Sequence, residues 1–234
     1  MSAGSRRAFV LALGVWPFGV VYGVAVSSAG LGTWPGVLGS VAIFAGASQL
    51  SLVELHDQGA FWLVAVGTAL VVNARFLLYS AALAPSFSEF PTGFRYLGAH
   101  LMTDQAVALS LLEYETEDDP LRRRGFYLGA ALTLFVMWQF GTLVGLLAGG
   151  SIPDGLQLGF IIPLMFTALV VPSLRDRPAL TAASVSVVVA LGTSFLPVGT
   201  NILLGAVAGM LAGGLASGGG PSGGGDIGSE GVSS

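Results

Sequence analysis

The sequence predicts an all-α polytopic integral membrane protein with about six to eight transmembrane segments, some of them broken or re-entrant. Of its 234 residues, 53% are hydrophobic and only 9% are charged, whereas soluble proteins average about 25% charged residues. The mean hydropathy of +0.81 leaves too little polar surface to cover a water-soluble domain. With no cysteine and two histidines, the chain excludes disulfides and thiolate chemistry and argues against a histidine-rich metal site. The sequence also lacks a G-x-S-x-G motif with an ordered acid and histidine, an H-E-x-x-H motif and a P-loop, so we expect no enzymatic activity, cofactor or metal. The net charge of -4 argues against nucleic acid as a partner.

Short polar breaks divide the apolar sequence into about eight segments. A helix that spans a membrane needs a length of roughly 20 residues. The last three are near or below that length, so six or seven spans with a re-entrant hairpin is the alternative. We expect residues 1–7 to form a cytoplasmic N-terminus, residues 8–215 a transmembrane domain, and residues 216–234 a disordered Gly/Ser-rich tail. The segments cover residues 8–30, 36–55, 61–83, 95–112, 125–149, 158–173, 178–195 and 199–215.

The arginines predict which side of the membrane each loop faces. With eight spans and a cytoplasmic N-terminus, both termini lie inside, Arg95 falls outside and Arg75 falls within a span. His56, beside Asp57, is then a surface residue at a cytoplasmic turn. The opening SRRAFV also resembles a twin-arginine export signal, but the further apolar segments that follow it favour a first span. The arginines expected inside are Arg6, Arg7, Arg122, Arg123, Arg124, Arg175 and Arg177.

Glycines recur every four positions and predict close helix packing, because this spacing places them on one helix face where backbones can approach. Gly or Pro also interrupts three segments, at Pro17, Gly46 and Pro163. Broken helices of this kind build transporter sites near the middle of the membrane, whereas a simple kink is the commoner outcome for any one proline. No internal repeat is visible in the sequence. The glycine series are Gly19/Gly23, Gly125/Gly129, Gly141/Gly145/Gly149 and Gly205/Gly209/Gly213.

Polar side chains within the apolar segments are the candidates for function. The third segment carries Asn73 and Arg75 near its middle, and the fourth carries His100 and Asp104. A charge at the membrane centre costs about 2.5–3.5 kcal/mol on insertion scales, so such residues face a partner or a watery cavity. The simplest interpretation of Arg75 and Asp104 is an ion pair between the third and fourth segments with a structural role. Such a pair can also bind a zwitterion if it lines a cavity. His100 and Asp104 lie four residues apart, a spacing that on one helix gives a shared face suited to a proton relay.

Ser48 raises an enzymatic alternative. Residues 46–48, Gly-Ala-Ser, together with His100 suggest a serine intramembrane protease similar to the rhomboid group. The serine motif of that group continues with glycine, whereas Gln49 follows here, and no second motif places His100 on a suitable late helix. We therefore rank this interpretation below transport.

Four blocks of the sequence resemble the AzlC family, the larger subunit of bacterial and archaeal branched-chain amino acid exporters. They occur in the order that the family shows and lie in the first half of the chain. Two positions depart from the family pattern: Phe76 stands where histidine is frequent, and Gln105 where glutamate is typical. The blocks are WPFGVVYGVA (16–25), FAGASQ (44–49), NARFLLYSAALAP (73–85) and LMTDQ (101–105).

The resemblance implies a secondary transporter that exports branched-chain or related apolar amino acids across the plasma membrane of a bacterium or archaeon. It also implies a small AzlD-type membrane subunit as a partner, and self-association into a homo-oligomer is a further option. Proton coupling is an additional expectation, with Asp104 and His100 as the candidate groups. The alternatives are a passive pore for small solutes, with Arg75 and Asp104 as selectivity charges, and a structural subunit that is inert without its partner.

A zwitterionic amino acid needs one site for its carboxylate and another for its ammonium group. We expect Arg75 to bind the carboxylate, helped by the N-terminus of a broken helix near Gly46, and Asp104 to bind the ammonium. Neutral hydrogen bonds are expected from Ser48, Gln49, Asn73 and Tyr79, and an apolar side-chain pocket from Phe44 and Phe76.

Overall fold

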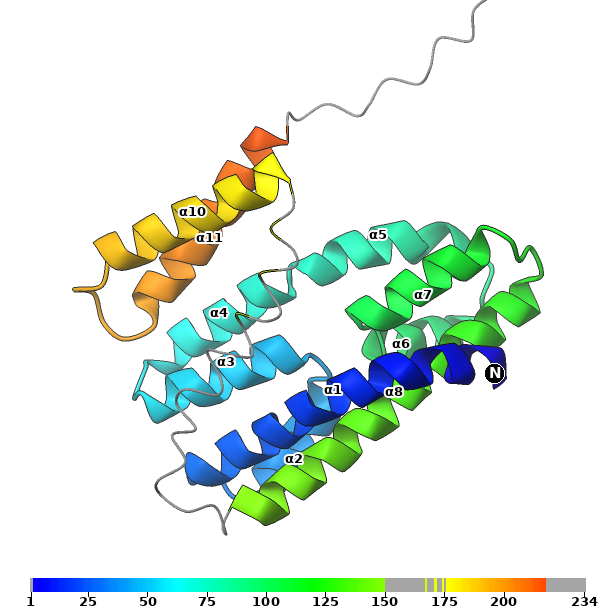
Figure 1. Cartoon of the computed structure of the whole chain (residues 1–234), viewed down its shortest axis with the longest axis horizontal. Helices are drawn as coiled ribbons and strands as arrows, with labels where there is room; N and C mark the ends of the chain where they lie inside the picture. The colour runs from blue at the N-terminus through cyan, green and yellow to red at the C-terminus, as the bar shows by residue number, and fades with distance from the viewer. Residues whose placement is uncertain (1, 150–166, 168–170, 172–173, 175, 218–234) are drawn as a thin grey trace, which may run out of the picture.

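The computed structural model describes residues 2–149, 167, 171, 174 and 176–217, and the elements it shows there are helices (Figure 1). Three stretches of the described chain are long and apolar enough to cross a membrane: Ala3–Ser28, Trp62–Ser88 and Pro120–Gly149. The predicted all-α membrane architecture is thereby confirmed. Pro163, most of the expected segment 158–173 and the tail beyond residue 217 lie outside the described residues.

The two longest helices, α1 (Ser2–Ser28) and α8 (Pro120–Gly149), run in parallel and pack along their whole length (Figure 1). Glycines allow their backbones to touch: a Cβ at Gly23 would overlap the carbonyl oxygen of Thr142, and a Cβ at Gly145 would overlap that of Val20. The close packing predicted from the glycine spacing is confirmed for these two helices. Pro17 lies inside α1 without interrupting it, so of the two alternatives the broken helix does not occur at this position.

The chain after α1 forms a re-entrant hairpin. Helix α2 (Thr33–Ala42) starts at the end of the bundle where α1 finishes, the chain breaks at residues 43–45, and α3 (Gly46–Asp57) returns to the same end. The side chain of Gln49 joins the two arms, because its Nε2 donates to the Gly39 carbonyl oxygen at 3.0 Å.

Helices α4 (Trp62–Asn73) and α5 (Arg75–Ser88) then cross to the other end of the bundle with a single break at Ala74 (Figure 1). A second hairpin enters from that end through α6 (Thr92–His100), breaks at residues 101–103 and returns through α7 (Asp104–Tyr114).

Contacts with α8 establish the direction of this second hairpin. The Tyr127 hydroxyl, near the start of α8, donates to the carbonyl oxygen of Gly98 in α6 at 2.6 Å. The Tyr114 hydroxyl, at the end of α7, donates to the carbonyl oxygen of Arg123 at 3.1 Å. Both arms therefore lie beside the first half of α8.

Two expected spans are thus hairpins that do not cross. Segments 36–55 and 95–112 each fold back at a polar tip, because each backbone breaks near its middle. Arg95 consequently lies at the same end as Arg7, where the guanidinium of Arg124 stacks on the Phe94 ring, and the expectation that Arg95 lies opposite is wrong. His56 lies at the other end, so its placement on the side of Arg7 is also wrong. We call the end that carries Arg6, Arg7, Arg95, Arg122, Arg123 and Arg124 the arginine-rich end.

The described chain contains an inverted repeat that the sequence does not reveal. Helix α1 followed by hairpin α2–α3 has the same order as α4–α5 followed by hairpin α6–α7, and the second unit runs in the opposite direction (Figure 1). Only the order and direction of elements repeat, so inspection of the residues could not find it.

The last described helices, α10 (Arg177–Gly192) and α11 (Thr200–Ala216), form an antiparallel pair that packs on α4 (Figure 1). A Cβ at Gly205 would lie 2.7 Å from the Ser186 carbonyl oxygen, and one at Gly209 would lie 2.7 Å from that of Ala182. The glycine series Gly205/Gly209/Gly213 therefore also serves close packing. The turn between the two helices lies near Leu55, at the end opposite the arginines.

The hairpins predict a specific pattern of chemical labelling in this cysteine-free chain. The single variants Arg6→Cys and Arg95→Cys should react with a membrane-impermeant maleimide added on one side of the membrane. The variant Asp57→Cys should react from the other side, because α1 is the one helix that crosses the membrane between residues 6 and 57. Labelling of intact cells and of inverted vesicles measures this, with the unsubstituted chain as the unreactive control. Reaction of positions 6 and 57 from the same side would overturn the hairpin topology.

A second prediction concerns the contact between α1 and α8. Gly23→Ala should lower the free energy of unfolding by about 1–3 kcal/mol, the usual cost of overpacking, because the new methyl group meets the backbone of α8. Gly14→Ala is the matched control in the same helix, since no described atom lies within 4 Å of a Cβ built there. Thermal unfolding in detergent compares the two, and equal unfolding temperatures would contradict the prediction.

Candidate functional site

The tips of the two hairpins meet halfway along the bundle. Phe135 lies midway along α8, and its ring is 5.1 Å from that of Phe44 in the first tip and 6.4 Å from that of His100 beside the second. The break at Ala74 places Arg75 at the same level, because its side chain reaches Asp104 at the start of α7. All three breaks therefore converge at mid-depth.

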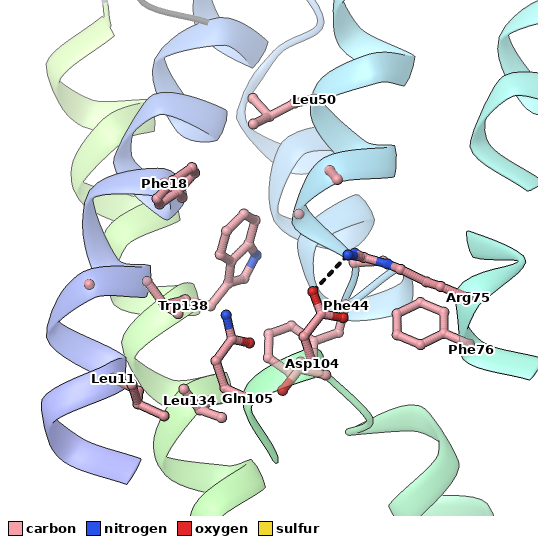
Figure 2. Close-up of a pocket in the computed structure, with 16 residues that line it drawn as sticks. Leu11, Phe18, Phe44, Leu50, Arg75, Phe76, Asp104, Gln105, Leu134 and Trp138 are labelled. Atoms are coloured by element: carbon pink, nitrogen blue, oxygen red, sulfur yellow. Dashed lines mark hydrogen bonds and ion pairs between the residues drawn. The ribbon is translucent and has the colours of Figure 1, made fainter. Parts of the chain in front are cut away.

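A cavity of about 240 Å³ occupies this meeting point (Figure 2). Helix α1 forms one wall and α5 the opposite one, with the two tips and α8 between them. The lining residues are Leu11, Gly14, Val15, Phe18, Phe44, Ala45, Gly46, Ala47, Leu50, Arg75, Phe76, Thr103, Asp104, Gln105, Leu134 and Trp138.

The polar feature of the cavity is the ion pair between Arg75 and Asp104. Arg75 Nη1 lies 2.7 Å from Asp104 Oδ2, which confirms the predicted pair (Figure 2). The two side chains remain 29% and 36% exposed, so the pair faces the cavity and is not sealed in the core. Each charge also keeps one buried polar atom, Arg75 Nε and Asp104 Oδ1, that has no hydrogen-bond partner within the described chain. These two atoms are themselves buried, whereas other parts of both side chains face the cavity.

The N-terminus of α3 adds positive potential beside this pair. The first hydrogen bond of the helix runs from the Gln49 N–H to the Ala45 carbonyl at 3.0 Å, which leaves the N–H groups of residues 46–48 without a helical acceptor. No side chain caps this helix end. By contrast, Thr103 caps α7 by accepting from the Ala106 N–H at 3.3 Å.

Gly46 allows this helix end to lie against α8. A Cβ at this position would come within 2.6 Å of the Trp138 ring, so a larger residue would push the tip away from the cavity wall. The expected helix start near Gly46 is confirmed.

Four of the residues expected to bind substrate line the cavity: Arg75, Asp104, Phe44 and Phe76. Ser48 and Gln49 do not line it and instead stabilise the first tip. The Ser48 hydroxyl donates to the Ala45 carbonyl oxygen at 2.9 Å, and Gln49 is 1% exposed with its amide bonded to α2.

Three other expected residues lie around the cavity. Asn73 ends α4 with a buried Oδ1 that has no partner among the described residues, and Tyr79 lies on α5 close enough to interact electrostatically with Arg75 and Asp104. His100 ends α6 whereas Asp104 begins α7, so the expectation that the two share one helical face is wrong. The break at residues 101–103 separates them.

The wall contributed by α1 was missed from the sequence. Leu11, Gly14, Val15 and Phe18 repeat at helical spacing and so lie on one face of α1. The only sequence signal for this face is a run of apolar residues, which looks the same whether it faces a neighbour, lipid or a cavity.

A buried network behind the cavity anchors the first hairpin to α8. The Trp138 Nε1–H donates to Ser40 Oγ at 3.0 Å, and Ser40 Oγ is also hydrogen-bonded to Thr142 Oγ1 at 3.0 Å. Gln139 Nε2 donates to the Ser40 carbonyl oxygen at 3.0 Å. Ser40 thus holds both the hairpin and the ring that forms the cavity wall.

Helices of membrane length, two re-entrant hairpins and a charged cavity at mid-depth define a polytopic α-helical membrane protein. The chain belongs to the AzlC family, because the family model described as "AzlC protein" matches residues 10–152. All four sequence blocks that resemble this family lie within the matched region.

Three relatives are also membrane proteins by name. The chain is 30% identical over 216 residues to an uncharacterized membrane protein of Archaeoglobus fulgidus, covering 90% of this chain and 93% of the relative. It is 22% identical over 214 residues to the inner membrane protein YgaZ of Escherichia coli, covering 89% and 87%. An uncharacterized membrane protein of Helicobacter pylori is 28% identical over 158 residues, covering 67% and 68%. No solved structure matches the chain.

The network around Ser40 predicts a stability effect. Ser40→Ala should lower the free energy of unfolding by about 1–3 kcal/mol, because it leaves the buried Trp138 N–H without an acceptor. Ser51→Ala is the matched control, since the Ser51 hydroxyl donates only within its own helix, to the Ala47 carbonyl oxygen. Thermal unfolding followed by tryptophan fluorescence measures the difference, and an unfolding temperature equal to that of the control would refute the anchoring role.

Proposed function

We propose that this protein is a secondary transporter that exports branched-chain or related apolar amino acids as zwitterions. The observation that carries the proposal is the Arg75–Asp104 ion pair in the mid-depth cavity, in which each charge retains a polar atom without a partner among the described residues. Arg75 carries the charge opposite to the carboxylate of an amino acid, and Asp104 carries the charge opposite to its ammonium group.

The carboxylate would be bound by two positive features. Arg75 supplies charged N–H donors, and the N–H groups of residues 46–48 supply the positive end of a helix. The ammonium group would bind Asp104, whose side chain is 36% exposed at the cavity. Substrate binding would thus exchange one ion pair for two, so that neither protein charge is left uncompensated at this depth.

The rest of the cavity suits an apolar side chain. Phe44, Phe76, Leu134 and Trp138 are among the apolar residues that line it. The volume of about 240 Å³ lies below the roughly 300–1,000 Å³ of pockets that bind drug-sized ligands, which favours a molecule of amino acid size.

The inverted repeat supports alternating access. In transporters, repeats of opposite orientation surround a central site and open it to each side in turn, with broken helices forming the site itself. Here one hairpin reaches the cavity from each end of the bundle. By the positive-inside rule the arginine-rich end would face the cytoplasm, with the protein in the plasma membrane. Proton coupling belongs to the proposal, with Asp104 and His100 as the candidate groups.

A small AzlD-type membrane subunit is part of the proposal. The cavity wall on α1 is open in the single chain: Leu11 is 39% exposed, and the ion pair across the cavity is also partly exposed. Charged groups at this depth face protein or water and not lipid. A partner subunit that covers this side would complete the site.

Counterflow of labelled leucine into proteoliposomes tests the proposal, with this chain alone and with its candidate partner. Asp104→Asn and Arg75→Gln should each reduce exchange by more than about tenfold, because loss of one charged partner costs about 2–5 kcal/mol. Asp57→Asn and Arg122→Gln are the matched controls, since both are exposed charges away from the cavity.

The double substitution Arg75→Gln with Asp104→Asn separates binding from folding. Each single variant leaves one charge without its partner and should lower the unfolding temperature. The double variant removes both charges, so its unfolding temperature should return to that of the unsubstituted protein, while leucine exchange remains absent. Normal leucine exchange in both single variants would overturn the site. Ion conductance without saturation or counterflow would replace the transporter with a pore.

A further inference from the structure

Gly14 is unlike the other glycines of α1. Gly4, Gly19 and Gly23 all contact the backbone of α8 so closely that a Cβ would clash. A Cβ at Gly14 would have no described atom within 4 Å, and its φ is not in the left-handed region. Glycine inside a helix is less favourable than alanine by about 0.8–1.0 kcal/mol. Packing and backbone conformation within the described chain therefore give no reason for glycine at this position.

The cavity explains why glycine occupies position 14. Gly14 lines it together with Leu11, Val15 and Phe18, and lies about one helical turn from Leu11 on one side and from Phe18 on the other. A side chain at position 14 would therefore point into the space between those two residues. Gly14 is exposed in the single chain, so its missing side chain widens the open α1 side of the cavity.

This wall lies across the cavity from the charges. Figure 2 shows Leu11 and Phe18 on α1 at one side, Arg75 and Phe76 on α5 at the other, and Asp104 between them. An amino acid whose charged groups bind Arg75 and Asp104 must extend its side chain away from that pair. The free direction leads towards α1 and the space above Gly14.

We propose that Gly14 determines the largest substrate side chain that the cavity accepts, because the apolar side chain of the substrate fills the space that glycine leaves open. The inference rests on the proposed amino acid transport and adds a specificity determinant to it. Alanine and glycine do not need this space, whereas leucine, isoleucine and valine do.

Substitutions of increasing size at position 14 test the inference in the reconstituted full chain. Gly14→Ala, Gly14→Val and Gly14→Leu should progressively weaken competition by unlabelled leucine against labelled alanine, while alanine exchange continues. A single methylene in an apolar pocket changes discrimination by about 10–200-fold, so Gly14→Leu should reduce the preference for leucine over alanine at least tenfold. Gly214→Leu is the matched control, because a Cβ there also meets no described atom within 4 Å and residue 214 does not line the cavity.

Each outcome decides the inference. Unchanged preference in an active Gly14→Leu variant overturns it and leaves the proposed transport intact. Loss of exchange for every amino acid in both Gly14→Val and Gly14→Leu, at an unaltered unfolding temperature, also overturns it, because a size limit spares alanine. Absence of saturable exchange of any amino acid by the unsubstituted protein, with and without its partner, overturns the proposed function and the role of Gly14 with it.

Discussion

The interior of a membrane offers no hydrogen bonds to a broken helix, and this constraint organises the structure. The chain breaks at residues 43–45, 74 and 101–103, and each break leaves backbone groups that need polar partners. The fold gathers all three at the level of Phe135, where the charges of Arg75 and Asp104 and the free N–H groups of α3 share one cavity. Polar groups that would be costly singly thus form one site, and a polar ligand there would complete their hydrogen bonding.

The glycine contact between α1 and α8 supplies the frame for this arrangement. Because their backbones touch, the two helices form a narrow parallel pair, and both hairpins pack against it. Ser40 and Tyr127 then fasten one hairpin each through buried hydrogen bonds. Glycine has two physical uses within α1: at Gly23 it allows backbone contact, whereas at Gly14 it leaves space beside the cavity. The surroundings of each residue, and not its identity, separate the two uses.

The two hairpins enter from opposite ends and bring different groups to the cavity. The first contributes the uncapped N-terminus of α3, and the second contributes Asp104 from the capped N-terminus of α7. Arg75 comes from the crossing pair α4–α5. In the proposed transport cycle the substrate carboxylate would contact both repeats, through α3 of the first and Arg75 of the second, whereas the ammonium would contact Asp104 of the second repeat alone. Movement of one repeat against the other would therefore alter the binding of the carboxylate.

Composition alone determined that this is a helical membrane protein, because 53% hydrophobic and 9% charged residues cannot cover a soluble fold. Opposite charges in neighbouring apolar segments predicted the Arg75–Asp104 pair, since neither can stay alone at that depth. Only the tertiary structure decided that segments 36–55 and 95–112 turn back, which reverses the sides of His56 and Arg95. An apolar segment of spanning length has the same composition whether it crosses or returns, and contacts of its tip with α8 decide between the two. For the same reason the α1 wall of the cavity could not be predicted from the sequence. An apolar helix face has the same sequence pattern whether it contacts lipid, protein or an empty space that a substrate can fill.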